Sequence, residues 1–370
     1  IQAMSSRRSA SWLELFYDLV FVALVAQFTY VVARQSWDVV AVLTTGIVGY
    51  MIFIAWWGTT VSRNLQDSET SKDRIVIQVQ MVLALLLSIY LPDVFLGESW
   101  FRFVGIYVLI RGLQWGVLLR TYIKYPETRP KTYNIAEGYA VAVFLWLLVA
   151  VVPEPYVFVI ALMALLVEVL TPLTVGRGNK TRYLNVEHMQ ERLGLFLLLV
   201  MGESVLVVAL SNTAVSVALT QPLVVVAGAL YMIALWWLYF SHLEYEAEGK
   251  RPTNLLVYLH AHAFLFGSVV LVAAAFKNVL THQKFVLSDA VLFVLGSVLM
   301  TTTLLIIREA LFGLRMIRLF VSCLLMVGYI LVGYISYIYD SLVLMILGGT
   351  ILVIFFALWD EMRRLKKRAE

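Results

Sequence analysis

Long apolar runs constrain this chain more than any other feature of its sequence. Apolar stretches of about 20 residues, the length that a helix needs to cross a bilayer, recur along the whole chain with short polar segments between them. We count twelve, at residues 11–33, 38–62, 75–91, 100–122, 136–152, 156–176, 190–211, 222–242, 256–278, 287–307, 315–337 and 340–360. Only 14% of the 370 residues are charged, against about a quarter in soluble domains. The chain therefore cannot fold as a soluble globular protein.

The continuity of these runs predicts helices and not barrel strands. Within a bilayer every backbone polar group must be bonded inside the protein; a helix achieves this within its own span, whereas barrel strands alternate apolar with polar residues. We therefore expect an all-α polytopic membrane protein with about twelve transmembrane helices. The loops between them are too short for a nucleotide-binding domain, and no Gly-x-Gly-x-x-Gly or Walker-type motif is present. ATP-driven pumping by this chain alone is thereby excluded.

The distribution of basic residues predicts which side of the membrane faces the cytoplasm. Of the 28 lysines and arginines, 23 fall on one side of the predicted spans and four, Arg34, Arg102, Lys277 and Lys284, on the other. Because basic residues concentrate on the cytoplasmic side, both termini are expected in the cytoplasm. The basic tail at 363–368 is expected to contact anionic lipid and not nucleic acid. Residues 1–10 lack the apolar segment of a signal peptide, so we expect none to be removed.

The two halves of the chain resemble each other weakly at an offset of 180 residues. Trp56 and Trp57 align with Trp236 and Trp237 at this offset. One interpretation is a parallel six-plus-six repeat, with an N-terminal membrane half at 1–176 and a C-terminal membrane half at 177–370. The other is chance similarity between two apolar sequences. Both tryptophan pairs fall near the expected cytoplasmic ends of their helices, where they would serve in an aromatic belt or in packing.

Ionisable residues inside the predicted spans are the most informative positions, because placing a charge there costs on the order of 3 kcal/mol or more. The acids are Glu14 and Asp18 in the first span, Glu168 in the sixth and Glu203 in the seventh, and the base is Arg111 in the fourth. Glu14 and Asp18 lie one turn apart on one helix face. We expect Arg111 to pair with Glu203 or Asp18. Such a pair is either a permanent packing device or one that breaks when a proton or substrate binds.

A second charged group lies at the cytoplasmic start of the seventh span. His188, Glu191 and Arg192 lie within about one turn, which suits either an ion pair or a gate. His188 and Glu191 have the spacing of metal ligands, but a zinc site needs three or four, so we predict neither a metal nor a cofactor. His260 and His262 begin the ninth span and point to different faces. We expect them to be interfacial or, in one case, part of a proton relay.

Two runs that keep charged residues at fixed spacing inside apolar sequence carry a resemblance to a known family. They are residues 14–22 (ELFYDLVFV) and residues 188–196 (HMQERLGLF), the second followed by Gly-Glu-Ser at 202–204. Along essentially its whole length the chain resembles the bacterial low temperature requirement protein A family. The resemblance implies a multi-pass protein of the bacterial inner membrane and supplies no substrate. The positions that match the motifs are Glu14, Asp18, His188, Glu191, Arg192 and Glu203. Membrane depth alone singles out Arg111 and Glu168.

The function that these features favour most is secondary transport of a small molecule or ion, coupled to a proton or another cation. Twelve spans and an internal repeat are typical of such transporters, and the embedded acids outnumber the embedded bases four to one. Two other classes stay open. One is a membrane sensor or structural protein whose buried charges serve in packing. The other, an enzyme that modifies lipids, would use His188 and Glu191 as an acid-base pair, but no nucleophile accompanies them. The expected partners are membrane lipids and a small substrate, and nothing in the sequence indicates an oligomeric state.

Overall fold

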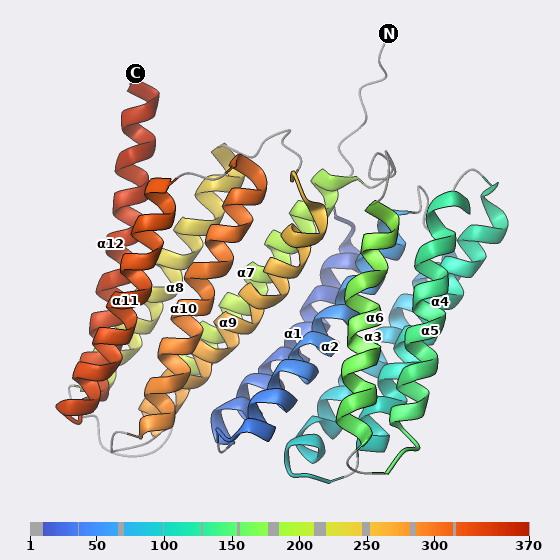
Figure 1. Ribbon diagram of the computed structural model, residues 1–370, viewed down its shortest axis with the longest axis horizontal. Helices are drawn as coiled ribbons and strands as arrows, with labels where there is room; N and C mark the ends of the chain where they lie inside the picture. The colour runs from blue at the N-terminus through green and yellow to red at the C-terminus, as the bar shows by residue number, and fades with distance from the viewer. Residues whose placement is uncertain are drawn as a thin grey trace. The chain divides into compact units, whose positions relative to one another are not determined.

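The computed structural model describes residues 10–35, 37–65, 70–98, 100–126, 129–153, 156–176, 185–210, 220–245, 252–281, 286–313 and 316–369. These ranges form twelve α-helices and contain no strand (Figure 1). The helices are α1 (Trp12–Arg34), α2 (Val39–Asn64), α3 (Ser71–Phe95), α4 (Trp100–Lys124), α5 (Arg129–Val149), α6 (Tyr156–Gly176), α7 (Val186–Leu210), α8 (Thr220–Tyr245), α9 (Leu255–Thr281), α10 (Leu287–Phe312), α11 (Met316–Ile338) and α12 (Leu342–Ala369). The prediction of an all-helical fold with about twelve helices is confirmed.

Most of these helices are long and apolar enough to cross a membrane. By length and composition, nine helices in the described ranges meet this requirement, namely α1 to α4 and α8 to α12. The apolar parts of α5 and α6 are shorter, at Ile135–Val149 and Tyr156–Thr171. In α7 four charged residues interrupt the apolar sequence, and these are Glu187, Glu191, Arg192 and Glu203. The protein is therefore a multi-pass membrane protein, and α7 carries charged residues within its apolar sequence.

Local sequence signals explain where several helices begin and end. The side chain of Asp38 caps α2 by accepting a hydrogen bond from the backbone N–H of Ala41 (2.8 Å). Thr70 and Asp73 form a reciprocal capping box at the start of α3. α10 ends at Phe312 and is followed by Gly313, whose φ of 75° lies in the left-handed region that glycine adopts without strain. The two side-chain caps bond backbone N–H groups that the helix itself leaves unbonded, and the glycine ends the helix.

The helices fall into two compact units. Unit 1 holds α1 through Val31, α2 to α6, and the start of α7 through Phe196. Unit 2 holds the end of α1 from Val32, the rest of α7 from Leu197, and α8 to α12. The predicted halves 1–176 and 177–370 and the six-plus-six repeat stay predictions. The predicted orientation in the membrane also stays a prediction. Some of the segments whose basic residues it depends on, including Lys284 and residues 1–9, lie outside the described residues.

Polar contacts within unit 1 join the ends of antiparallel helices. The start of α1, the end of α2 and the start of α7 meet through Glu14, Arg63 and His188. At the start of α3, Asp73 accepts a hydrogen bond from Arg120 near the end of α4 (3.0 Å). One end of unit 1 therefore gathers charged side chains from five helices, and the candidate site extends inward from this end.

The two tryptophan pairs differ in their surroundings. In unit 1, Trp56 and Trp57 are 0% and 5% exposed, whereas Trp236 and Trp237 in unit 2 are 40% and 43% exposed. The Trp56 indole stacks on Phe196, with ring centroids 4.4 Å apart. Trp56 and Trp57 therefore have the packing role. Trp236 and Trp237 have the half-exposed setting that is typical of an aromatic belt.

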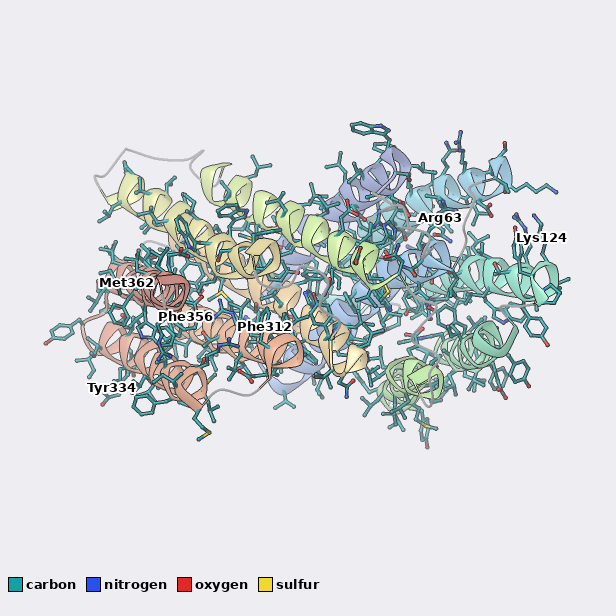
Figure 2. The ribbon with its side chains drawn as sticks, turned by 90° about the horizontal axis from the view of Figure 1, so that it is seen from above. Arg63, Lys124, Phe312, Tyr334, Phe356 and Met362 are labelled. Atoms are coloured by element: carbon teal, nitrogen blue, oxygen red, sulfur yellow. The ribbon has the colours of Figure 1, made fainter. Side chains whose placement is uncertain are left out.

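Large apolar side chains also cover much of the outer surface of each unit. On α11, for example, Tyr334 is exposed, whereas Phe356 on the neighbouring α12 is buried (Figure 2). An exposed apolar surface of this extent is typical of a protein that contacts lipid. The buried charges described below are therefore inside the protein and not on its lipid-facing surface.

Candidate functional site

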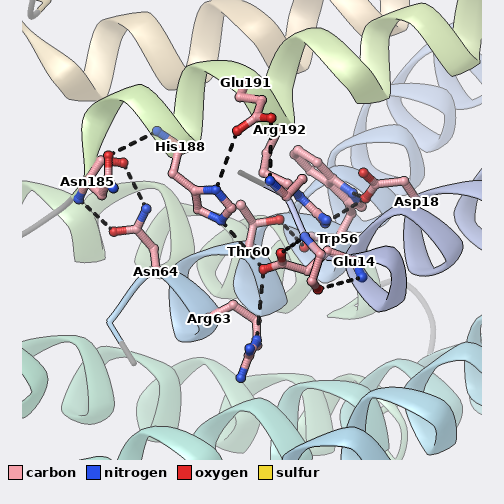
Figure 3. A network of polar contacts seen from close by, with 12 residues as sticks. Glu14, Asp18, Trp56, Thr60, Arg63, Asn64, Asn185, His188, Glu191 and Arg192 are labelled. Atoms are coloured by element: carbon pink, nitrogen blue, oxygen red, sulfur yellow. Dashed lines mark hydrogen bonds and ion pairs between the residues drawn. The ribbon is translucent and has the colours of Figure 1, made fainter. Parts of the chain in front are cut away.

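Two helices of unit 1 bring four of the predicted residues together. Glu14 and Asp18 lie one turn apart on α1, and His188 and Arg192 lie one turn apart at the start of α7. The equal spacing places Glu14 beside His188 and Asp18 beside Arg192 (Figure 3). All four side chains are buried. Residues 174 positions apart in the sequence thus form one charged cluster.

The ion pair between Asp18 and Arg192 is bonded through only one carboxylate oxygen. Nη2 of Arg192 donates a hydrogen bond to Oδ1 of Asp18 (2.7 Å), and the indole N–H of Trp56 donates to the same oxygen (2.6 Å). Among the described residues, Oδ2 of Asp18 and both Nε and Nη1 of Arg192 are buried without a hydrogen-bond partner. Because a guanidinium and a carboxylate can form two parallel bonds, this pair leaves bonding capacity unused on both sides.

His188 lies between two carboxylates. Its Nε2 is 3.5 Å from Oε1 of Glu14, and its Nδ1 is 3.8 Å from Oε2 of Glu191 (Figure 3). Neither ring nitrogen has a hydrogen-bond partner in the described part of the chain. Nε of Arg63 on α2 lies 3.9 Å from the same oxygen of Glu14. Since the Glu191 side chain is 41% exposed and Glu14 is buried, the three groups run from the surface into unit 1.

Two asparagines hold the start of α7 against the end of α2. Nδ2 of Asn64 donates to the backbone carbonyl of Asn185 (2.9 Å), and the backbone N–H of Asn185 donates to Oδ1 of Asn64 (2.9 Å). Oδ1 of Asn185 also accepts from the backbone N–H of His188 (3.1 Å), which caps the helix. These bonds fix the position of the first turn of α7 and therefore of His188.

The second buried ion pair, between Arg111 and Glu168, is fully bonded at the carboxylate. Nε of Arg111 donates to Oε1 of Glu168 (2.8 Å), and the hydroxyl of Tyr107 donates to Oε2 (2.8 Å). Nη1 of Arg111 donates to Oε1 of Gln114 (2.5 Å), and its guanidinium lies 3.9 Å from the centroid of the Tyr139 ring. This pair is thus held by α4, α5 and α6 together.

The predicted partners of Arg111 were wrong. Its carboxylate partner is Glu168, and Asp18 pairs with Arg192 instead. Membrane depth orders residues along one direction only, so it could not show that α6 supplies the acid. The predicted four-to-one excess of acids is smaller inside unit 1, where the four described buried acids Glu14, Asp18, Asp73 and Glu168 face three buried arginines. These arginines are Arg63, Arg111 and Arg192.

A hydroxyl on α2 connects the surroundings of both ion pairs. Oγ1 of Thr59 accepts from the hydroxyl of Tyr17 (2.9 Å) and from Nε2 of Gln114 (3.0 Å), and it donates to Oε1 of Gln80 (2.6 Å). Nε2 of Gln114 also donates to the carbonyl of Ala55 (2.6 Å). Because Tyr17 precedes Asp18 and Gln114 contacts Arg111, one polar network extends from α1 to α6 through the interior of unit 1.

Gly58 allows this network to pass beside α2. A Cβ atom at this position would clash with Oε1 of Gln114 and would lie 2.5 Å from Nη1 of Arg111. Both distances are shorter than real Cβ contacts. The absence of a side chain at Gly58 is therefore a requirement for the bond between Arg111 and Gln114.

A small pocket lies against the network between α2, α3 and α4. Its volume is about 10 Å³, which is room for about one water molecule. The polar residues that line it are Thr59, Ser62, Arg63, Asp73, Gln80 and Gln114. The pocket therefore places a water-sized space next to the Thr59 hydroxyl.

Glu203, the predicted deep acid of α7, belongs to unit 2. It is 7% exposed, and its Oε2 has no hydrogen-bond partner among the described residues. The positive charge of Lys277 near the end of α9 acts on it. Glu203 is therefore a buried carboxylate with a basic neighbour and with hydrogen-bonding capacity to spare.

Two buried acids of unit 2 were missed in the sequence. Asp360 contacts Arg308 (3.3 Å), which also donates to the carbonyl of Leu238 (2.8 Å) and so joins α8, α10 and α12. Asp289, near the start of α10, accepts a hydrogen bond from Nδ2 of Asn278, near the end of α9 (2.9 Å). Both acids lie inside predicted apolar spans. The criterion that singled out Asp18 would therefore have found them.

Of the two α9 histidines, His262 has a contact at each of its ring nitrogens. Nδ1 of His262 lies 2.7 Å from the carbonyl oxygen of Tyr258, and Nε2 lies 2.8 Å from the hydroxyl of Tyr239. A carbonyl only accepts hydrogen bonds, so Nδ1 carries the proton and Nε2 of the neutral ring accepts from Tyr239. His262 is fully buried and so is not interfacial. The proposed relay role of an α9 histidine stays a prediction.

The candidate site is a set of charged and polar side chains and not a recognisable metal centre. In the described ranges, no group of three or more histidine, cysteine, aspartate or glutamate side chains is arranged to hold a metal ion. What the arrangement can do chemically is exchange protons at carboxylates and at an imidazole, and bind a charged group through the guanidinium of Arg192.

Comparison with known proteins agrees with the motif resemblance. Residues 9–357 match the family model of the bacterial low temperature requirement A protein. An uncharacterised protein of Rhizobium meliloti (strain 1021) is 23% identical over 296 residues, which cover 75% of this chain and 71% of that protein. No solved structure matches the chain.

Proposed function

This chain belongs to the family of bacterial low temperature requirement A proteins, and from this premise we propose that it is a proton-coupled secondary transporter of the bacterial inner membrane. Both termini lie in the cytoplasm in this proposal, as the basic residues predict. Asp18 and Arg192 form the working pair, and the substrate is a small molecule or ion. Arg111 and Glu168 hold the helices around this pair.

The observation that carries the proposal is the incomplete bonding of Asp18 and Arg192. Taking two charges out of water costs several kcal/mol each, and a buried pair offsets this cost only when its remaining bonding groups are satisfied. Here Oδ2 of Asp18 and two nitrogens of Arg192 are not satisfied by described residues. A proton on Oδ2 neutralises the carboxylate and loosens Arg192, which then has three nitrogens available for a substrate or for another acid.

Glu203 is the second proton-binding acid in this proposal. It is buried, and its Oε2 lacks a hydrogen-bond partner among the described residues. Its charge interacts with that of Lys277 in the same unit. A proton on Glu203 would remove this attraction, so the acid is suited to couple proton binding to a change in unit 2.

A current measurement after a pH jump tests the proposal without knowledge of the substrate. Proteoliposomes on a solid-supported membrane are switched rapidly between two pH values, and proton binding inside the protein displaces charge and gives a transient current. We expect a transient for the unaltered protein and its loss in Asp18→Asn and Glu203→Gln. Glu98→Gln, which changes an exposed acid between α3 and α4, serves as the matched control and should keep the transient.

The outcomes separate the proposal from its alternatives. Absence of a transient in the unaltered protein would overturn transport. If the transient is lost in Asp18→Asn but kept in Glu203→Gln, Glu203 has no part in the mechanism and Asp18 is the acid that binds the proton. Once the transient is established, jumps in Na⁺, K⁺ and small-molecule concentration identify the substrate.

One observation favours a second candidate, a membrane sensor or structural protein. The pocket beside the network holds about one water molecule (about 10 Å³), which is far smaller than the 300–1,000 Å³ or so of a typical ligand site. A sensor of this kind needs only a change in protonation and no passage for a substrate. It gives a pH-jump transient but no current after any substrate jump, so the same apparatus distinguishes the two.

A further inference from the structure

We infer that His188 is the proton relay between the surface of unit 1 and the Asp18–Arg192 pair. The inference rests on the proposed function and adds the route by which the proton arrives. The sequence alone left His188 as a gate or an ion-pair member. Its position between an exposed and a buried carboxylate is what indicates a relay (Figure 3).

One ring nitrogen of His188 faces an exposed carboxylate and the other faces a buried one. Nδ1 is 3.8 Å from Glu191, whose side chain is 41% exposed, and Nε2 is 3.5 Å from Glu14, which is buried. The imidazole itself is 1% exposed, and among the described residues neither nitrogen has a hydrogen-bond partner. Both distances are at or beyond the limit of hydrogen bonding, so the ring bonds neither carboxylate in this arrangement and must move toward one of them to bond it. A buried histidine that served only in packing would be expected to have its nitrogens bonded, as His262 does.

The transfer balances without any further reactant. A protonated Glu191 gives its proton to Nδ1, and Nε2 gives its own proton to the Glu14 carboxylate, so one proton leaves Glu191 and one arrives at Glu14 while the ring stays neutral. The ring is left with its proton on Nδ1, and exchange with water, in which Nδ1 releases a proton while Nε2 takes one, restores the starting tautomer. Glu14 then lies one helical turn from Asp18, at the entrance to the working pair.

The charges around His188 come from each helix that contacts it. On α1 they are Glu14 and Asp18, on α2 Arg63, and on α7 Glu191 and Arg192. Nε of Arg63 lies 3.9 Å from Oε1 of Glu14, and the positive charge of Arg192 also acts on Glu14. Two positive charges therefore lie near the carboxylate to which the relay delivers its proton. The capping bond from the backbone of His188 to Asn185 fixes the helix turn while leaving the ring itself unbonded.

The test separates the rate of proton arrival from the amount of charge that binds. In the pH-jump measurement, His188→Gln should slow the transient on the order of 100-fold, the scale of general acid-base catalysis, while the total displaced charge stays within about twofold. Glu98→Gln, which changes an exposed acid between α3 and α4, is the control and should leave the rate unchanged. Added imidazole should restore at least about a tenth of the rate in His188→Ala, since a diffusing base can replace a relay but not a packing contact.

Each result bears on one claim. A missing transient in the unaltered protein overturns the proposed function, and the relay with it. A normal transient whose rate is the same in His188→Gln and Glu98→Gln overturns the relay alone. Loss of displaced charge in His188→Gln, in protein that elutes normally from size exclusion, also overturns it, because the histidine would then belong to the binding site. Slowing without loss of charge, together with rescue by imidazole, establishes the relay.

Discussion

The two buried ion pairs of unit 1 are nearly equal in length and differ in how completely they are bonded. Arg111 and Glu168 approach to 2.8 Å, and Asp18 and Arg192 to 2.7 Å. Around the first pair, both carboxylate oxygens accept hydrogen bonds, one from Arg111 and one from a tyrosine. Around the second, one oxygen accepts two bonds and the other accepts none from the described residues. Bonding of the surrounding groups, more than distance, therefore distinguishes a pair that holds helices together from one that can change.

The largest effect is expected from breaking the fully bonded pair. Glu168→Gln leaves the Arg111 guanidinium buried without a carboxylate, which should lower the free energy of unfolding by about 3–5 kcal/mol. Asp18→Asn should cost clearly less. Asparagine keeps an acceptor oxygen for Trp56, and the charge of Arg192 also acts on Glu14. Unfolding in mixed micelles with increasing SDS measures both variants.

Glu98→Gln is the control for this comparison, because surface substitutions usually stay within about 0.5 kcal/mol. Equal destabilisation by Glu168→Gln and Asp18→Asn would mean that the two pairs do not differ in the way their hydrogen bonds indicate. A loss of the pH-jump transient in Asp18→Asn at nearly normal stability would sharpen the distinction between holding and working pairs.

A smaller effect is expected from filling the space beside the fully bonded pair. Gly58→Ala places a methyl group against Gln114 and Arg111, and overpacking of this kind typically costs about 1–3 kcal/mol. Gly46→Ala is the matched control on the same helix, since nothing lies within 4 Å of a Cβ atom there. It should be neutral or stabilising by up to about 1 kcal/mol, because alanine is the better helix former. If both variants unfold alike, the close approach of α2 to Arg111 is not as described.

The smallest effect concerns the bond between Trp56 and Asp18. Trp56→Phe removes the indole N–H while keeping an aromatic ring against Phe196. A double-mutant cycle with Asp18→Asn should give a coupling energy of about 1 kcal/mol, the usual net value of a hydrogen bond. The same cycle with Trp57→Phe should give almost none, since Trp57 stacks on Phe53. Equal coupling in the two cycles would assign the effect to packing.

The helices could be predicted from the sequence because apolar continuity depends on local composition alone. All twelve appear close to their expected positions, and α12 differs most, since it continues through the basic tail to Ala369. The identity of the charged residues was predictable for the same reason: an acid such as Asp18 inside an apolar run must lie inside the protein. It is indeed fully buried.

The pairing of these charges could not be predicted, because it depends on which helices are neighbours. Depth in the membrane made Asp18 and Glu203 reasonable partners for Arg111, yet α6 lies in the same unit as α4 and supplies Glu168. The role of Trp56 was equally hidden. A tryptophan near the end of a span is as typical of an aromatic belt as of packing. The burial of Trp56, its stacking on Phe196 and its bond to Asp18 decide between them.

The hydroxyl of Thr59 has a consequence for how this sequence can evolve. It accepts from Tyr17 and Gln114 and donates to Gln80, so it uses its one hydrogen and both of its lone pairs. A change at any of these four positions leaves another member with a buried, unmatched group. Relatives should therefore keep the four residues as a set or exchange several of them together, and residues on α1, α2, α3 and α4 should covary as one inherited unit.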